Sequence, residues 1–114
     1  MSAQVNGSSN GNLQSNSANI TVPNNGLIGF EAHFVAAESG TLTSTFIKVE
    51  GAVKNTGSAA IVGAVTTFYV AEDTPGLHNI RVTVSGNEVI FNFVNSGNAQ
   101  AKGVCYVRYT QTFF

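Results

Sequence analysis

Charged side chains are scarce in this sequence of 114 residues. They make up 10% of the chain, against about 25% in an ordinary soluble protein, and Asn, Ser, Thr and Gly supply most of the polar character. Five basic and six acidic side chains give a formal net charge of −1. The sequence therefore lacks the basic patch that binds nucleic acid or an anionic membrane surface. We expect neither as a partner, and the composition argues against most enzymes.

Cysteine and long apolar runs are also lacking. The single Cys105 excludes an internal disulfide framework and a zinc site with several cysteines. No apolar run reaches the ~18 residues that a transmembrane helix needs. The start MSAQVNGSSNG has neither the basic nor the apolar region of a secretory signal, so we expect none. The length suits one domain, which buries about 65% of its unfolded surface and can form a core without crosslinks or metal.

Residues 1–25 differ in composition from the rest of the chain. They contain seven Asn, five Ser and two Gly, and the first charged residue of the sequence is Glu31. Such a segment buries too little apolar surface to offset the ordering of its backbone. We interpret it as a polar N-terminal arm before a β-domain at 26–114, held in place by that domain, a sister subunit or a neighbouring protein. Its few apolar residues, the candidates for docking the arm, are Val5, Leu13, Ile20 and Val22.

From Ile20 onward the pattern is typical of β-strands, with Val, Thr, Phe, Ile and Tyr in short alternating runs. Residues 88–94 are apolar on both faces, which indicates a central strand or one at an interface. Ser85-Gly86-Asn87, Asn55-Thr56-Gly57-Ser58 and Asn95-Ser96-Gly97-Asn98 are turn signals. No segment has a capped 3.6-residue period, so we predict an all-β fold, a small antiparallel β-sandwich or jelly-roll-like domain. The predicted strands lie near 19–22, 27–37, 43–54, 60–70, 78–85, 88–94 and 103–112.

The ionisable residues form no convincing catalytic or metal-binding set. Glu72-Asp73 precede a Pro-Gly pair and are interpreted as a turn rather than as the carboxylate pair of a glycosidase. Glu31 and His33 share a strand face, a spacing too common to indicate a metal or an acid–base pair. His78 is expected to cap or pair at a strand start, and Cys105 to be a small buried hydrophobe. We therefore expect no catalytic, cofactor-binding or metal-binding residue, and no enzymatic activity.

The C-terminus is rich in aromatic residues. The chain ends Tyr109-Thr110-Gln111-Thr112-Phe113-Phe114, and terminal Phe side chains are rarely left in water, because each exposes a large apolar area. They are buried either inside the same domain or between subunits. A charge-poor surface also suits packing against further copies of the chain. The candidate residues of an oligomer interface are Phe91, Phe93, Tyr109, Phe113 and Phe114.

The stretch from Phe46 to Thr110 has an ordered series of short motifs. They are VEGAV at 49–53, AIVGAVTT at 60–67, AED at 71–73, VTVSGNEV at 82–89 and VCYV at 104–107. This series resembles a small β-domain of bacteriophage virion proteins, found near the ends of tail fibres and in small capsid decoration, or cement, proteins. The resemblance implies a place on the virion surface after assembly in the bacterial host cytoplasm. It also implies a homotrimer, and it brings no catalytic residue.

Three functions remain open from the sequence. The first is a capsid decoration protein whose arm docks on the major capsid protein. The second is a tail-fibre or tail-tip component that attaches to other tail proteins and presents loops to a host surface receptor. The third is a small carbohydrate-binding or adhesion module, because Asn-, Thr- and Tyr-rich loops can form hydrogen bonds with sugars. The loops expected to contact a receptor are 38–43, 55–59, 72–77 and 95–102.

Overall fold

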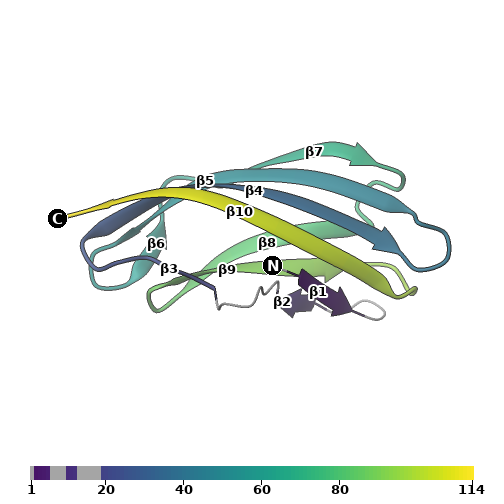
Figure 1. Ribbon diagram of the computed structural model, residues 1–114, viewed down its shortest axis with the longest axis horizontal. Helices are drawn as coiled ribbons and strands as arrows, with labels where there is room; N and C mark the ends of the chain where they lie inside the picture. The colour runs from purple at the N-terminus through teal and green to yellow at the C-terminus, as the bar shows by residue number, and fades with distance from the viewer. Residues whose placement is uncertain (1, 6–9, 13–18) are drawn as a thin grey trace.

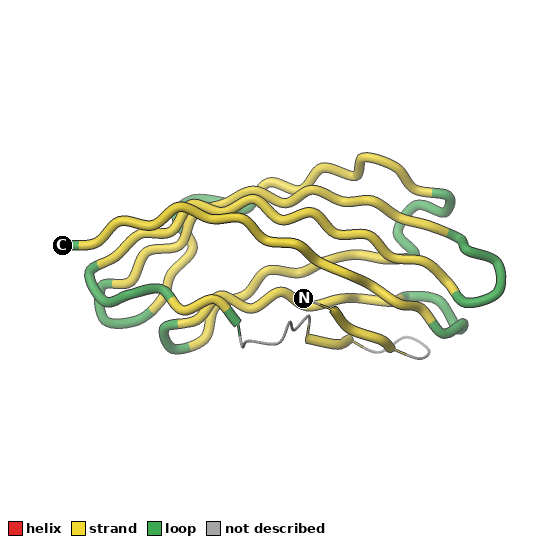
Figure 2. The backbone as a smooth tube through the Cα atoms, viewed as in Figure 1, coloured by secondary structure: helices red, strands yellow, loops and turns green. Residues whose placement is uncertain are grey.

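A computed structural model describes residues 2–5, 10–12 and 19–114, and side chains from residue 19 onward. It confirms the predicted all-β class: the described residues form antiparallel strands packed as a small β-sandwich, with no helix among them (Figures 1 and 2). The sandwich is elongated, with extents of 49, 23 and 19 Å along its principal axes. In the described part of the chain, no helix is long and apolar enough to cross a membrane.

Two sheets face each other. In the larger one the strands follow the order β1-β10-β4-β5, and the far side of β5 is shared by β6 and β7. In the smaller one β9 pairs with β8 along its whole length, and β2 and β3 share its other side. The strands are β1 Ser2–Val5, β2 Asn10–Asn12, β3 Ile20–Thr21, β4 Gly26–Glu38, β5 Ser44–Asn55, β6 Ala59–Ile61, β7 Thr66–Glu72, β8 His78–Ser85, β9 Glu88–Asn95 and β10 Ala101–Phe113.

Period-two alternation builds the core between the sheets. Along β4 every second side chain from Ile28 to Ala36 is buried, and the intervening ones face away from the core. Two aromatic pairs join the larger sheet to the smaller one. The rings of Phe30 and Phe91 meet edge to face at 5.4 Å between centroids, and those of Phe34 and Phe93 lie 5.2 Å apart. Such pairs add to the stabilisation that burial of the rings already provides.

The three predicted turns are confirmed. Gly86 has a φ of 59° in the hairpin that joins β8 to β9, a conformation that glycine adopts without a steric cost. After β5, the Asn55 side chain accepts a hydrogen bond from Gly57 N at 2.9 Å. After β9, Asn95 accepts one from Gly97 N at 3.0 Å. Asparagine therefore closes two of the turns through its own side chain, as its enrichment in turns predicts.

The strand predicted over 60–70 is two strands. β6 and β7 are separated by residues 62–65, where Gly63 takes a φ of 65°. Both strands pair with β5, β6 near its end at Val53–Asn55 and β7 further back at Thr45–Glu50. The chain therefore leaves the sheet at Gly63 and returns to the same edge of β5.

The described parts of residues 1–25 pair within the chain. β1 runs antiparallel to the start of β10, and β2 and β3 lie against β9. Just after β3, Val22 N donates to Asn87 O at 2.7 Å, and Val22 O accepts from Asn55 Nδ2 at 2.9 Å. Of the three anchors that we considered for this segment, its own domain therefore holds the described strands. The division at residue 25 stays a prediction.

Candidate functional site

The outer face of the larger sheet, the face turned away from the core, is the most distinctive surface of the described chain. The strand register places Val104 of β10 opposite Val35 of β4, and Val35 opposite Phe46 of β5. The two valines are 46% and 51% exposed. In the next row, Tyr106 and Phe68 lie on the two sides of the sheet and are 69% and 45% exposed. Apolar side chains therefore form a band on this face that is continuous across Val104, Val35 and Phe46 and is interrupted by His33 and Lys48 in the next row.

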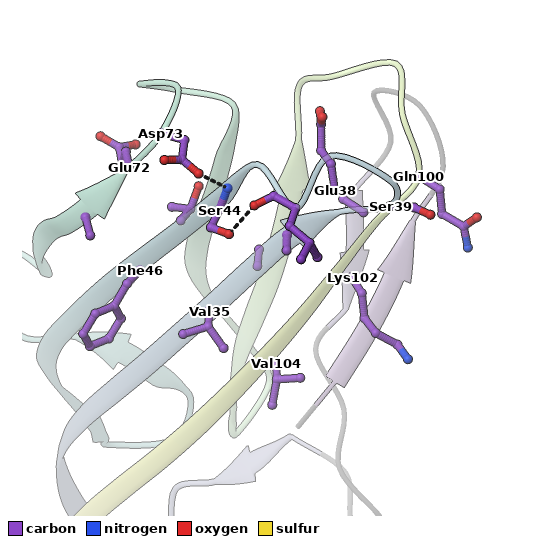
Figure 3. A pocket seen from close by; sticks show the side chains of 16 residues that line it. Val35, Glu38, Ser39, Ser44, Phe46, Glu72, Asp73, Gln100, Lys102 and Val104 are labelled. Atoms are coloured by element: carbon purple, nitrogen blue, oxygen red, sulfur yellow. Dashed lines mark hydrogen bonds between the residues drawn. The ribbon is translucent and has the colours of Figure 1, made fainter.

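A groove of about 800 Å³ lies at one end of this band. Its floor is formed by Val35, Phe46 and Val104, which extend side by side from adjacent strands in Figure 3. Polar side chains stand around this floor, and two of the carboxylates are held by backbone amides. Asp73 accepts from Ser44 N at 2.8 Å, and Glu72 accepts from Gly76 N at 3.3 Å. The polar side chains labelled around the floor are Glu38, Ser39, Ser44, Glu72, Asp73, Gln100 and Lys102.

Three of the four predicted contact loops meet at this groove. Residues of loops 38–43, 72–77 and 95–102 line it, and backbone hydrogen bonds such as Ser39 N to Gln100 O, at 2.8 Å, tie neighbouring loops together. Loop 55–59 lies at the opposite end, where Ala59 N donates to Gly86 O (Figure 1). The fold therefore gathers at one end three loops that are far apart in the sequence.

A cluster of ionisable groups surrounds Glu31 on the same outer face, and two of its members, His33 and Lys48, stand between Tyr106 and Phe68. His33 Nε2 is 2.6 Å from one carboxylate oxygen of Glu31, Arg108 is 3.5 Å from the other, and Lys48 lies at 4.0 Å. The hydrogen bond from His33, with the positive charges of Lys48 and Arg108, lowers the pKa of Glu31 despite some desolvation. The Glu31 carboxylate is therefore already paired with basic side chains of its own chain. Among the described residues, no group of three His, Cys, Asp or Glu side chains could hold a metal ion.

The two remaining chemically interesting groups are buried. Cys105 is 1% exposed, and burial raises the pKa of its thiol to about 12, so the predicted role of a small buried hydrophobe is confirmed. His78 begins β8 and is completely buried, with Nδ1 3.1 Å from Thr45 Oγ1. The predicted pairing of this histidine with a neighbour is therefore also confirmed. Desolvation lowers the pKa of His78, and the carboxylate of Glu38 opposes this shift.

The predicted interface residues separate into two groups. Phe91 and Phe93 are completely buried and face the larger sheet from β9, a central strand of its sheet. This corrects their assignment to an oligomer interface, because side chains that form the core cannot contact another subunit. Tyr109, Phe113 and Phe114 are exposed by 49%, 62% and 105%. Their part in an interface stays a prediction.

The predicted docking residues lie in four different settings. Val22 is completely buried in the core, so its side chain is not presented to a neighbouring protein. Ile20 is partly buried against that core, and its part in docking stays a prediction. Val5 lies in β1, opposite Ala101 of β10, and Leu13 lies outside the described residues. The assignment of Val22 is thus corrected by the same burial that builds the sandwich.

Sequence reasoning missed the apolar band. Period-two alternation predicts which side chains of a strand face the core. It does not predict that the side chains on the opposite face, such as Val35, Val104 and Phe68, form a second apolar surface. A signal was nevertheless present, because β10 has apolar residues on both faces between Val104 and Val107. In a strand at one side of a sheet, this pattern indicates a second contact surface.

Comparisons with known proteins assign no family to this chain. No protein family matches the sequence, and no curated protein matches it. A solved structure with a similar arrangement is the tailspike protein gp49 from Acinetobacter baumannii bacteriophage Fri1, a capsular polysaccharide depolymerase. The TM-score is 0.41 and the identity 15%, over 99% of this chain and 21% of that one. The chain thus spans about a fifth of the length of that protein, and a likeness of this degree assigns no function.

Proposed function

We propose that this chain is a non-enzymatic structural protein of the bacteriophage virion surface, a capsid decoration protein that binds the major capsid protein through the outer face of its larger sheet. The exposed band of Val35, Val104, Tyr106 and Phe68 carries this proposal. Apolar side chains gathered on one exposed face are a mark of a protein interaction site. The order of β-motifs resembles that of β-domains in virion proteins, which supports another virion protein as the partner.

The contact is assigned to this face rather than to residues 1–25. The described strands of that segment pair within the chain, and Val22 is in the core. The outer face, in contrast, has both apolar area and the polar rim that a protein interface needs.

The number of copies per virion tests the proposal. Quantitative mass spectrometry of purified particles would compare this chain with the major capsid protein, and a capsid decoration protein is expected at about one copy per capsid subunit or per lattice position. A few copies per particle would contradict a decoration role. Loss of capsid binding in Val104→Lys would then identify the face, with Val62→Lys as the matched control, because the two valines are similarly exposed at 46% and 42%.

A tail-fibre or tail-tip role is the second candidate, favoured by the groove at the end of the sandwich. Three loops meet there around an apolar floor with carboxylate, hydroxyl and amide groups at its rim, an arrangement that suits recognition of a polar ligand with an apolar face. This candidate predicts few copies per particle and loss of adsorption to the host in Phe46→Ser or Gln100→Ala. Normal adsorption by both variants would argue against it.

A further inference from the structure

β10 has a long edge with which, beyond Val104, no strand of the described residues pairs. On one side it pairs with β4 without interruption, from Ala101 to Phe113. On the other side β1 covers only Ala101–Val104, and no other described strand pairs there. Figure 1 shows β1 beside the first part of β10 and the remainder of β10 continuing to the C-terminus. Over residues 106–113, every second residue therefore directs its N–H and C=O away from the sheet.

This edge lacks the features that usually prevent strand pairing between molecules. Natural sheet edges are protected by lysine, proline, bulges or short length. Residues 106–113 read YVRYTQTF, with one charged residue, Arg108, and no proline. Their pairing with β4 has no register shift. β7, on the other side of the sheet, differs: its pairing with β5 contains a register shift between Phe46 and Ile47, and it runs into Glu72 and Asp73.

We propose that a second copy of this chain pairs with residues 106–113 of β10 in antiparallel fashion, so that the two larger sheets join into one across a two-fold axis. An exposed row of alternating N–H and C=O groups fits an extended strand, which would add to the sheet through main-chain hydrogen bonds. A two-fold axis perpendicular to the sheet sets one residue opposite itself. The axis that we propose passes through Tyr109, because this register pairs seven residues and sets two aromatic rings together.

The side chains fit this register. Around an axis at Tyr109, Arg108 lies opposite Thr110 of the second copy, and Tyr106 lies opposite Thr112. The one charge of the edge therefore meets a hydroxyl rather than its own copy, and like charges directly opposite each other would destabilise the pair. The perpendicular axis keeps both outer faces on the same side, so the apolar bands of the two copies form one surface.

The inference does not depend on the proposed virion role, because the isolated chain would pair in the same way. It does differ from the trimer that the sequence resemblance implies. A two-fold contact closes at two copies, whereas a trimer of this sheet needs two different edges, for example β10 of one copy on β7 of the next. The dimer and the trimer can therefore be distinguished experimentally, because the dimer requires the edge of β10 alone and the trimer also requires the edge of β7.

The test uses the full chain in solution. Sedimentation equilibrium over a range of concentrations is expected to show a reversible species of twice the 11.9 kDa chain mass. Thr110→Lys should raise the dimer dissociation constant about tenfold, because the lysine faces Arg108 of the second copy, and Thr110→Glu should lower it by a similar factor. Thr66→Lys on β7 adds the same charge to the other edge and should change nothing. Circular dichroism checks that each variant is folded.

Hydrogen exchange identifies the contact itself. In the dimer, alternate backbone amides within 106–113 should gain protection, and in dilute monomer they should lose it. A chain that stays monomeric up to about millimolar concentration would overturn the inference, as would a trimer that is weakened by both Thr110→Lys and Thr66→Lys. Equal weakening by Thr110→Lys and Thr110→Glu would overturn the register centred on Tyr109.

Discussion

The two faces of the larger sheet are built from the same strands but serve different purposes. On the inner face of β4, Phe34 is completely buried against Phe93, while the next residue, Val35, is 51% exposed on the outer face. Both positions are apolar, so hydrophobicity does not separate them. What separates them is the presence of the smaller sheet on one side only. The inner face therefore determines the stability of the chain, and the outer face is available for contacts with other molecules.

The largest expected effect comes from the inner face. Phe93→Ala removes a ring that contacts Phe34 and His78 and should lower the free energy of unfolding by ~3–5 kcal/mol, because the cavity cannot collapse fully. Urea denaturation monitored by circular dichroism would measure it. A loss of less than about 1 kcal/mol, the size of an exposed-site effect, would contradict the assignment of Phe93 to the core.

A matched pair of glycines gives the next largest difference. A Cβ added to Gly103 on the inner side would lie 2.8 Å from an atom of the Phe34 ring and 3.0 Å from one of Phe93, so Gly103→Ala should destabilise by ~1–3 kcal/mol through overpacking. A Cβ at Gly29 on the outer side has no atom within 4 Å, and Gly29→Ala should stabilise by ~0.5–1 kcal/mol because it restricts the unfolded chain. Thermal melts of the two variants side by side would test the contrast. Equal effects would contradict it.

His78 makes the inner face sensitive to pH. Because its pKa is lowered in the folded chain, the unfolded chain binds the proton more readily. The stabilisation is therefore complete above the unfolded pKa of about 6.5 and decreases as the pH falls below it. Urea midpoints between pH 7.5 and 5 should decrease for the native chain and for His33→Gln, whose histidine lies on the outer face. The decrease should be smaller in His78→Gln, and an unchanged slope in that variant would exclude His78 as its origin.

The smallest effect on stability is expected on the outer face. Tyr106→Ser changes a side chain that is 69% exposed, and the free energy of unfolding should change by no more than about 0.5 kcal/mol. If the outer face binds a partner, the same variant should weaken that binding, because exposed aromatic side chains contribute strongly to interfaces. A large loss of stability would show that Tyr106 belongs to the fold rather than to a contact surface.

Local patterns predicted most of the architecture. Alternation located the strands from β4 onward within one or two residues at most ends, and Gly86, Asn55 and Asn95 marked their turns. The prediction was wrong at Gly63, where a positive φ divides one expected strand into two. A glycine within an apolar run is also compatible with a continuous strand, so residue types alone did not reveal this break.

The candidate site was predicted less well, because a site depends on which segments meet. The four contact loops were recognised one by one, but their spacing along the chain did not indicate that three of them surround one groove. Phe91 and Phe93 were assigned to an interface because their strand is apolar on both faces. Which of two apolar faces is covered depends on the position of a distant sheet.

The sequence by itself determined the strand class, the turn positions and the scarcity of charge, because these follow from backbone preferences and side-chain periodicity over a few residues. Only the tertiary structure decided that the segment around Val22 belongs to the core, that no described strand covers the outer face of the larger sheet, and that none of the described strands pairs with the outer edge of β10 beyond Val104. These features depend on pairing between residues far apart in the sequence, such as Ser2 with Val104. Local strand preference does not specify such pairing, since a strand with the right alternation can lie at the centre or at the edge of a sheet.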